Sequence, residues 1–152
     1  MRRYGHTRVS DCALLEFPKV PDLRGNLTFI ETARHVPFEI KRLFYLYDVP
    51  AGGLRGGHAH RTLEQVMICL SGSFEVCLDD GAKQRIVSLN RPWMGLYIPS
   101  MIWDTETNFE PATVCLVLAS DYYDEADYVR DYSEFLKAKL ESRLRAVGQG
   151  PG

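Results

Sequence analysis

The middle of the chain consists of short apolar or alternating runs, separated at close intervals by turn residues. Ser71-Gly72 is one such turn, and Asp79-Asp80-Gly81 is another. The helical period of 3.6 residues is absent from this region. Short β-rich runs between Gly and Asp turns are typical of an all-β sandwich or barrel. The runs cover residues 43–49, 63–70, 74–78, 85–89, 95–99 and 113–118.

The two ends of the chain differ from each other. Residues 14–17 and 27–32 are compatible with extended strands. From Ala126 to Ala146 the apolar residues recur at helical spacing, with acidic residues before them and arginines at the end. We therefore predict one domain over residues 1–152. It has a β-barrel over about 10–120, a C-terminal helix over about 124–146 and a frayed tail over 147–152.

Composition excludes several classes of protein. The 152 residues carry 18 Lys and Arg against 20 Asp and Glu, a formal net charge of -2, which argues against general nucleic-acid binding. No apolar run approaches the roughly 20 residues that a membrane helix needs. The first 18 residues do not read as a signal peptide, and the four cysteines form no CxxC pair. We expect a cytoplasmic protein that binds neither nucleic acid nor membrane.

The sharpest local feature is the segment Arg55-Gly56-Gly57-His58-Ala59-His60, with Glu64 four residues further on. Side chains alternate along a strand, so His58 and His60 would point to the same side with the small Ala59 between them. The two glycines allow a ligand or another backbone to approach closely. This pattern indicates a site for one metal ion or one substrate, whereas two surface histidines on a loop are the simpler alternative.

These residues resemble a known motif. Gly52, His58, His60, Glu64 and Gly72 resemble the first motif of the cupins, with one extra residue before the last glycine. The resemblance implies a double-stranded β-helix, the cupin or jelly-roll barrel. A larger set of segments, spread from about residue 22 to 132, is similar to the sugar-nucleotide 3,4-ketoisomerases within the cupins. The segments are Ile40–Tyr45, Arg55–His60, Leu63–Gln65, Leu78–Gly81, Gly95–Tyr97 and Leu118–Tyr128.

The second cupin motif departs from the usual pattern. Its histidine would fall at Asp104, and no glycine follows two positions after Pro99. His58, His60, Glu64 and Asp104 could still hold a divalent metal, but the loss of one imidazole weakens that set. The resembling family is described as metal-independent dimers that exchange N-terminal strands. We therefore expect no metal, no cofactor, and a homodimer with exchanged N-terminal strands.

The resemblance implies that a dTDP-linked 4-oxo-6-deoxyhexose is the substrate and that its keto group moves from C4 to C3. A base removes the proton at C3, which leaves an enediolate, and C4 is then protonated. A histidine with an unperturbed pKa suits this work. By analogy with the family motif His58 is our first choice for the base and His60 is its partner, although spacing alone does not rank them.

Candidate substrate-binding residues lie in the segments that carry the resemblance. Arginine suits the diphosphate because its guanidinium makes paired hydrogen bonds to phosphate oxygens. A tyrosine hydroxyl could hold a sugar oxygen, and an asparagine could bind the base or the sugar. The candidates are Arg24, Asn26, Arg42, Tyr45 and Arg55.

Three other functions remain open at this point. A 3- or 5-epimerase would act on the same nucleotide sugar and leave the ketone at C4. A metal-dependent cupin oxygenase would use the two histidines with Glu64 and Asp104. A non-catalytic sugar-binding cupin would bind the ligand without turnover. The configuration of the product at C4 and the identity of the nucleotide do not follow from the sequence.

Overall fold

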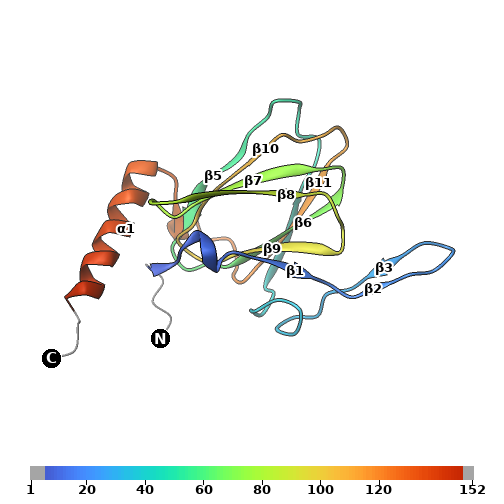
Figure 1. Cartoon of the computed structure of the whole chain (residues 1–152), viewed down its shortest axis with the longest axis horizontal. Coiled ribbons are helices and arrows are strands. Elements are labelled where there is room, and N and C mark those ends of the chain that lie inside the picture. Colours follow the sequence, from blue (N-terminus) through green and yellow to red (C-terminus); the bar gives the residue numbers. More distant parts are fainter. Residues whose placement is uncertain (1–5, 149–152) are drawn as a thin grey trace.

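The computed structural model describes residues 6–148. Most of its strands form two antiparallel five-stranded sheets that face each other (Figure 1). The first sheet has the order β1 (Ala13–Glu16), β9 (Met94–Ile98), β6 (Gln65–Ser71), β11 (Val114–Ala119) and β4 (Arg42–Leu46). The second has the order β12 (Tyr128–Val129), β5 (Arg55–His60), β10 (Trp103–Thr107), β7 (Phe74–Asp79) and β8 (Gln84–Leu89). This arrangement confirms the all-β double-sheet fold.

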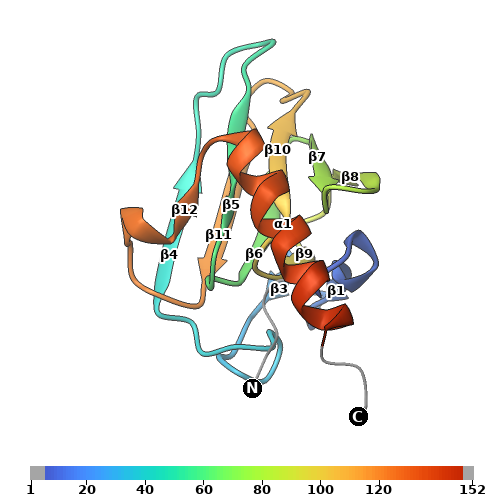
Figure 2. The same cartoon turned by 90° about the vertical axis from the view of Figure 1, so that its left-hand side faces the viewer.

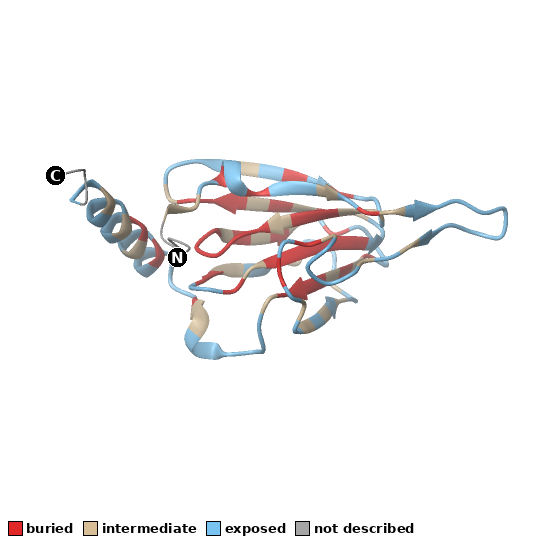
Figure 3. Ribbon diagram, turned by 90° about the horizontal axis from the view of Figure 1, so that it is seen from below, coloured by how far each residue is buried: buried red, intermediate tan, exposed pale blue. Residues whose placement is uncertain are grey.

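The main core lies between the two sheets. Strand alternation places one apolar set inward, as in β7, where Phe74, Val76 and Leu78 are almost completely buried. Phe74 stacks on Phe109 with ring centroids 5.2 Å apart. In Figure 3 the buried residues run along the strands of both sheets, whereas the helix and the N-terminal hairpin are mostly exposed.

A hairpin leaves the barrel near the N-terminus. Strands β2 (Lys19–Val20) and β3 (Leu27–Thr28) pair with each other and with no other strand of the described residues. β1, in contrast, pairs with β9 of the same chain. We call residues 19–28 the arm. It projects from the barrel at the end opposite to the helix (Figure 1).

The C-terminal helix is shorter than predicted. α1 spans Tyr132–Val147, whereas the expected helix began near residue 124. The difference has a physical reason: Tyr128 and Val129 form β12 and pair with His60 and Ala59 of β5. Asp131 then caps the helix, because its side chain accepts a hydrogen bond from the backbone N–H of Glu134. Of the predicted tail, residues 149–152 lie outside the described part of the chain.

The helix packs across one end of the barrel (Figure 2). Phe135 is fully buried and its ring lies 5.6 Å from that of Trp103 on β10. Lys139 is also buried, and its Nζ donates hydrogen bonds to the carbonyl oxygens of Thr7, at 2.6 Å, and Met101, at 3.1 Å. Within residues 6–148 no helix is long and apolar enough to cross a membrane.

Candidate active site

A cavity of about 370 Å³ lies between the two sheets. Its walls combine mainly apolar side chains of the first sheet, with Gln65 of β6 as a polar exception, and mainly polar and charged side chains from the side of the second sheet. The polar residues that line it are Arg55, His58, Gln65, Asp104, Glu106, Tyr128 and Arg130. The apolar ones include Phe44, Leu46, Met67 and Val117. A concave site with a few converging polar groups is the usual form of a small-molecule site.

A bulge in β5 sets the direction of His58. Asp104 on β10 lies opposite His58 and Thr105 lies opposite Gly56, so Gly57 is an extra residue without a partner. Gly56 and Gly57 both have φ of +74°, which suits glycine and is unfavourable for other residues. A bulge of this kind redirects neighbouring side chains. The two glycines that the sequence places before the histidines therefore shape the cavity wall.

The structure brings the two histidines together but gives them different surroundings. Their ring centroids are 5.1 Å apart at an interplanar angle of 81°. The ring of Tyr128, on β12, lies 5.0 Å from that of His58 and 4.4 Å from that of His60. His58 lines the cavity, whereas His60 is 4% exposed and does not line it. His58 is thus the histidine that a ligand in the cavity would meet.

The surroundings of His58 keep its imidazole neutral. Burial, reinforced by the neighbouring His60 and Arg130, lowers the pKa of His58 to about 4, although the Gly56 carbonyl and Glu125 oppose the shift. The sequence led us to expect an unperturbed histidine with a pKa nearer 7. At neutral pH, His58 is therefore wholly in the form that accepts a proton.

His60 is held by a carboxylate. Its Nδ1 lies 3.5 Å from Oδ2 of Asp127. Asp127 also accepts hydrogen bonds from the backbone N–H of Thr62 at 2.9 Å, the hydroxyl of Thr62 at 2.7 Å and the backbone N–H of Leu63 at 3.1 Å. Burial alone would raise the pKa of Asp127, but these contacts and the one with His60 lower it to about 2. His60 therefore faces a carboxylate that stays ionised.

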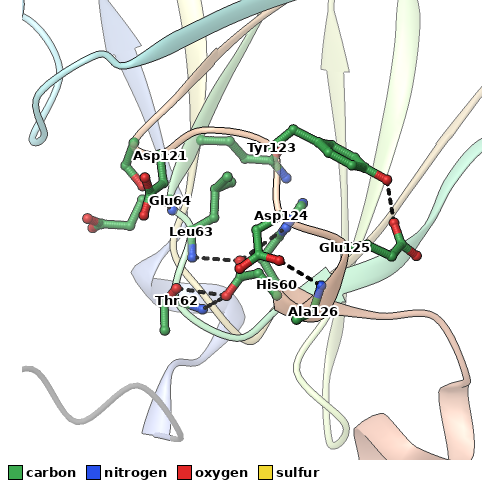
Figure 4. Close-up of polar contacts among 12 residues, drawn as sticks. His60, Thr62, Leu63, Glu64, Asp121, Tyr123, Asp124, Glu125 and Ala126 are labelled. Carbon is green, nitrogen blue, oxygen red and sulfur yellow. Dashed lines mark hydrogen bonds and ion pairs between the residues drawn. The ribbon is translucent and has the colours of Figure 1, made fainter.

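The segment from Asp121 to Ala126 folds over the end of β5 (Figure 4). The hydroxyl of Tyr123 donates to the carboxylate of Glu125 at 2.6 Å, and the side chain of Asp124 accepts from the backbone N–H of Ala126. Glu125 also pairs with Arg130, with 2.6 Å between Oε1 and Nε. The guanidinium of Arg130 lies 4.2 Å from the centroid of the Tyr128 ring. This segment thus holds Tyr128 and Arg130 beside the histidines.

The predicted substrate-binding residues on β4 and β5 divide between two faces. Arg55 lines the cavity. Arg42 lies on the same side of β4 as the cavity residue Phe44, and its guanidinium lies 5.1 Å from the Phe44 ring centroid. Tyr45 is on the opposite side of β4 and is 57% exposed. The structure therefore does not bring Tyr45 to the cavity of its own chain.

The other two predicted substrate-binding residues belong to the arm. Arg24 is at its tip and pairs with Asp22, with 2.8 Å between Nε and Oδ1. Its side chain is 91% exposed. Asn26 lines a second cleft, of about 500 Å³, on the outer face of the first sheet. Within one chain, neither residue lines the histidine cavity.

Glu64, the fourth residue of the possible metal set, faces elsewhere. It accepts a hydrogen bond from the hydroxyl of Tyr97, and it does not line the cavity with His58 and Asp104. Among residues 6–148, no group of three or more His, Cys, Asp and Glu side chains is arranged to hold a metal ion. The ligand set that the oxygenase alternative requires is therefore not assembled in this part of the chain.

Sequence reasoning assigned no role to several residues of the cavity. Tyr128 ends the segment Leu118–Tyr128 of the resemblance and Arg130 lies two residues beyond it, but only the pairing of β12 with β5 brings them to the histidines. Gln65 lies in the segment Leu63–Gln65 of the resemblance but was given no role, and Glu106 lies outside all of those segments. Asp104 was singled out only as a possible metal ligand.

Comparisons with known proteins agree on one family. The sequence model of the FdtA family, described as WxcM-like, C-terminal, matches residues 10–140. The chain is 45% identical over 135 residues to the TDP-4-oxo-6-deoxy-alpha-D-glucose-3,4-oxoisomerase of Aneurinibacillus thermoaerophilus, which covers 89% of this chain and 97% of that protein.

Two solved structures extend the comparison. The 3,4-ketoisomerase QdtA of Thermoanaerobacterium thermosaccharolyticum was crystallised as a histidine-to-asparagine mutant in complex with TDP-4-keto-6-deoxyglucose. It is 40% identical with a TM-score of 0.84, over 86% of this chain and 94% of QdtA. The WlaRB TDP-quinovose 3,4-ketoisomerase of Campylobacter jejuni is 46% identical with a TM-score of 0.80, over 84% of this chain and 98% of WlaRB.

These relatives confirm the resemblance stated from the sequence. The two solved structures share the fold over most of their length, and all three relatives are named as ketoisomerases or oxoisomerases of a nucleotide sugar. The chain with its histidine-lined cavity therefore belongs to the FdtA family of sugar 3,4-ketoisomerases.

Proposed function

We propose that this protein moves the keto group of TDP-4-oxo-6-deoxyglucose from C4 to C3, with His58 as the base. The observation that carries the proposal is the position of His58. It is a neutral imidazole in the wall of a polar cavity, in a chain 45% identical to an oxoisomerase of this substrate. A mutant that replaces one histidine of QdtA with asparagine was crystallised with the keto sugar, which fits a histidine-dependent step.

The reaction needs two proton transfers at carbon, and a proton must also be lost from the C3 hydroxyl and gained by the C4 oxygen. The proton at C3 is acidic because it lies next to the C4 carbonyl. His58 removes it, an enediolate forms, and the imidazolium returns the proton to C4. Donors near the developing oxyanion lower the barrier, and Arg55, Arg130 and Tyr128 line the same cavity. Electrons are only relocated within the sugar, so the step needs no external oxidant.

The negative charges of the diphosphate require cationic partners. Arg42 and Arg55 lie beside the cavity, whereas Arg24 and Asn26 are on the arm. We assign substrate binding to these four residues, with the arm residues serving the cavity of a second chain. Tyr45, on the outer face of β4, is assigned to the contact between chains instead of to the sugar.

We also propose that the protein is a homodimer that exchanges its arms. The outer face of the first sheet exposes apolar side chains next to the second cleft, among them Leu43 and Leu70. The arm exposes further ones, including Val20, Leu23 and Leu27. Contiguous exposed apolar surface of this kind marks an interaction site. Among the described residues β2 and β3 pair only with each other, so the outer edge of each can accept a strand of another chain. A second copy is the occupant, because the arm carries predicted ligands that its own cavity does not receive.

Conversion of TDP-4-oxo-6-deoxyglucose in deuterated water, followed by NMR, tests the activity. We expect the keto carbon signal to move from C4 to C3, with deuterium at C4 to the extent that the imidazolium of His58 exchanges its proton with solvent before it protonates C4. The configuration at C4 is read from the same spectrum. A ketone that stays at C4 with exchange at C3 or C5 would identify an epimerase, and binding without any change would identify a non-catalytic protein. Activity that disappears on chelation and returns with one divalent metal would contradict the metal-free mechanism.

A further inference from the structure

Strand β10 directs two carboxyl groups into the cavity. Asp104 and Glu106 are two positions apart on the strand, so both face inward, and they are 1% and 2% exposed. Acidic residues are almost never this buried unless they are paired. Both line the cavity that contains His58. The proposed roles above leave these two residues unused.

The two carboxyl groups have too few donors to be both ionised. Oδ2 of Asp104 accepts a hydrogen bond from Nε2 of Gln65 at 2.9 Å. The oxygens Oδ1 of Asp104 and Oε1 of Glu106 are buried, and no donor among the described residues gives either of them a hydrogen bond. The groups lie within hydrogen-bonding reach of each other. Two close carboxylates in a buried site cannot both carry a charge, so they hold a proton between them.

The electrostatic environment agrees with this geometry. Burial and the neighbouring Glu106 raise the pKa of Asp104 well above its ordinary value, while Gln65 opposes the shift. Burial also raises the pKa of Glu106, although Asp104, Arg55 and His60 oppose it.

The neighbouring strand makes room for the pair. Gly56 on β5 has φ of +74°, and a Cβ there would lie 2.5 Å from Oε2 of Glu106 and 2.8 Å from the carbonyl oxygen of Asp104. The bulge at Gly57 then sets His58 directly opposite Asp104. Cβ atoms of opposite residues in an antiparallel pair lie about 4.5–5.5 Å apart. A sugar in the cavity would thus lie against both His58 and Asp104.

We propose that Asp104 and Glu106 share one proton and that Asp104 transfers it between the two sugar oxygens while His58 transfers the carbon-bound proton. This inference rests on the proposed ketoisomerase function. It assigns Asp104 as a second catalytic residue and Glu106 as the positioning residue that keeps the proton available.

The steps balance. His58 takes the proton from C3, the electron pair of the C3–H bond forms the C3–C4 double bond, and Asp104 gives its proton to the carbonyl oxygen at C4. Asp104 then takes the proton from the hydroxyl at C3, the C3 ketone forms, and the imidazolium of His58 gives its proton to C4. During the intermediate His58 gains one positive charge and the carboxyl pair gains one negative charge. The net charge of the cavity therefore stays constant, and both groups end as they began.

The charged and titratable groups facing the carboxyl pair come from several elements. On β5 these groups are Arg55, His58 and His60. Two thiols also interact with the carboxyl pair: that of Cys12, which precedes β1, and that of Cys115 on β11. Tyr128 and Arg130 complete the wall of the shared cavity. Burial raises the pKa of Cys12 to about 12 and that of Cys115 further still, so both thiols stay neutral at pH 7.

Infrared spectroscopy of the full chain tests the shared proton without an activity assay. We expect a band of a protonated carboxyl group at pH 7 that shifts in deuterated water. It should be present in the wild type and in Glu75→Gln, a control on the outward side of β7, and absent in the double variant Asp104→Asn/Glu106→Gln. A wild-type spectrum without any band that the double variant removes would overturn the shared proton.

Steady-state kinetics test the transfer. Asparagine keeps the shape of Asp104 and can donate a hydrogen bond but cannot transfer a proton. Asp104→Asn should lower kcat by about 10²–10⁴-fold, with KM within a few-fold of the wild-type value. Glu106→Gln should lower kcat less and shift the alkaline limb of the pH profile, which a merely structural role would not do. An active wild type with unchanged kcat in Asp104→Asn would refute the assignment while leaving the ketoisomerase function intact. An inactive wild type would refute the function, and the infrared result would still decide the shared proton.

Discussion

The two faces of the first sheet have opposite chemistry. Its inner face closes a cavity of about 370 Å³ whose far wall carries two carboxyl groups, an arginine and a neutral histidine. Its outer face borders a cleft of about 500 Å³ lined mainly by Ile and Leu side chains, beneath the arm. Strand alternation produces this division: in β4, Phe44 and Leu46 face the cavity, while Leu43 and Tyr45 face outward.

The difference indicates what each face does. Buried ionisable groups are costly for folding, so their presence on the inner side points to chemistry there. The apolar side chains that stay partly exposed on the outer side, among them Leu43 and Leu70, contribute less to the stability of a single chain than fully buried ones do. They become useful when another surface covers them. Substitutions on the inner side should therefore change turnover without changing assembly, and substitutions on the outer side should primarily change assembly.

The largest effect is expected from the inner face. His58→Asn should lower kcat by about 10²–10⁴-fold, because asparagine fills a similar space but cannot accept a proton. The molecular mass in solution and nucleotide binding should stay unchanged. Steady-state kinetics measure kcat, and light scattering on the same sample measures the molecular mass. His60→Asn is the matched variant, and it should reduce kcat less because His60 does not line the cavity. Near-normal turnover in His58→Asn with an inactive His60→Asn would reverse the assignment.

A comparable effect on assembly is expected from the outer face. A buried leucine contributes about 1.5–3 kcal/mol, and a symmetric interface contains each residue twice. Leu43→Asp should therefore weaken the dimer by about 3–6 kcal/mol, or roughly 10²–10⁴-fold in its dissociation constant. Analytical ultracentrifugation over a dilution series measures this change.

Ile86→Asp is the control for that variant. Ile86 is 66% exposed on β8, at the edge of the other sheet, so its replacement should leave the dimer intact. A wild type that sediments as a monomer at micromolar concentration would contradict the proposed dimer. If Leu43→Asp and Ile86→Asp weakened the dimer equally, the interface would not lie on the outer face of the first sheet.

The sequence predicted strands well where one face is apolar. The alternation of β4 and the apolar runs of β6, β7 and β11 were found because their inward residues are hydrophobic. β10 was missed because two of its inward positions are Asp104 and Glu106, which hide the pattern. The predicted start of the helix was wrong because Glu125 and Asp127, among the acidic residues before it, lie in a short 3-10 helix. The next residues form β12, which forms only through its pairing with β5.

The candidate site was predictable to the extent that it is local in sequence. The two histidines and the glycines before them are contiguous, so strand geometry alone indicated a shared site. Tyr128 and Arg130 reach the cavity from about 70 residues further along the chain, and no local pattern gives such a contact. The placement of Arg24 depends on the direction of the arm, which is set by packing and not by the residues around Arg24.

A smaller effect is expected from the arm, which connects the two faces in our proposal. Arg24→Ala should raise KM by about 10–150-fold, since losing a charge-assisted hydrogen bond costs about 1.5–3 kcal/mol. kcat should change little, because Arg24 is remote from the reacting carbons. Arg34→Ala is the matched control: Arg34 is an exposed arginine that pairs with Glu31, as Arg24 pairs with Asp22. Equal KM values in wild type and Arg24→Ala would show that Arg24 of the arm does not bind the substrate.

The smallest effect is expected from a moderate change of pH. Only neutral His58 accepts a proton, and its pKa is lowered from 6.5 to about 4. The acid limb of kcat/KM should therefore appear near pH 4, and the change between pH 7 and pH 5.5 should stay below about twofold.

Stability should respond differently. Between pH 6.5 and pH 4 the unfolded chain binds a proton at this residue and the folded chain does not, so the free energy of unfolding should decrease as the pH falls. Chemical denaturation at several pH values measures that slope, and His58→Asn should reduce it. An acid limb near pH 6.5 in the wild type would show that the inner face does not shield His58, and the contrast between the two faces would then lose its electrostatic basis.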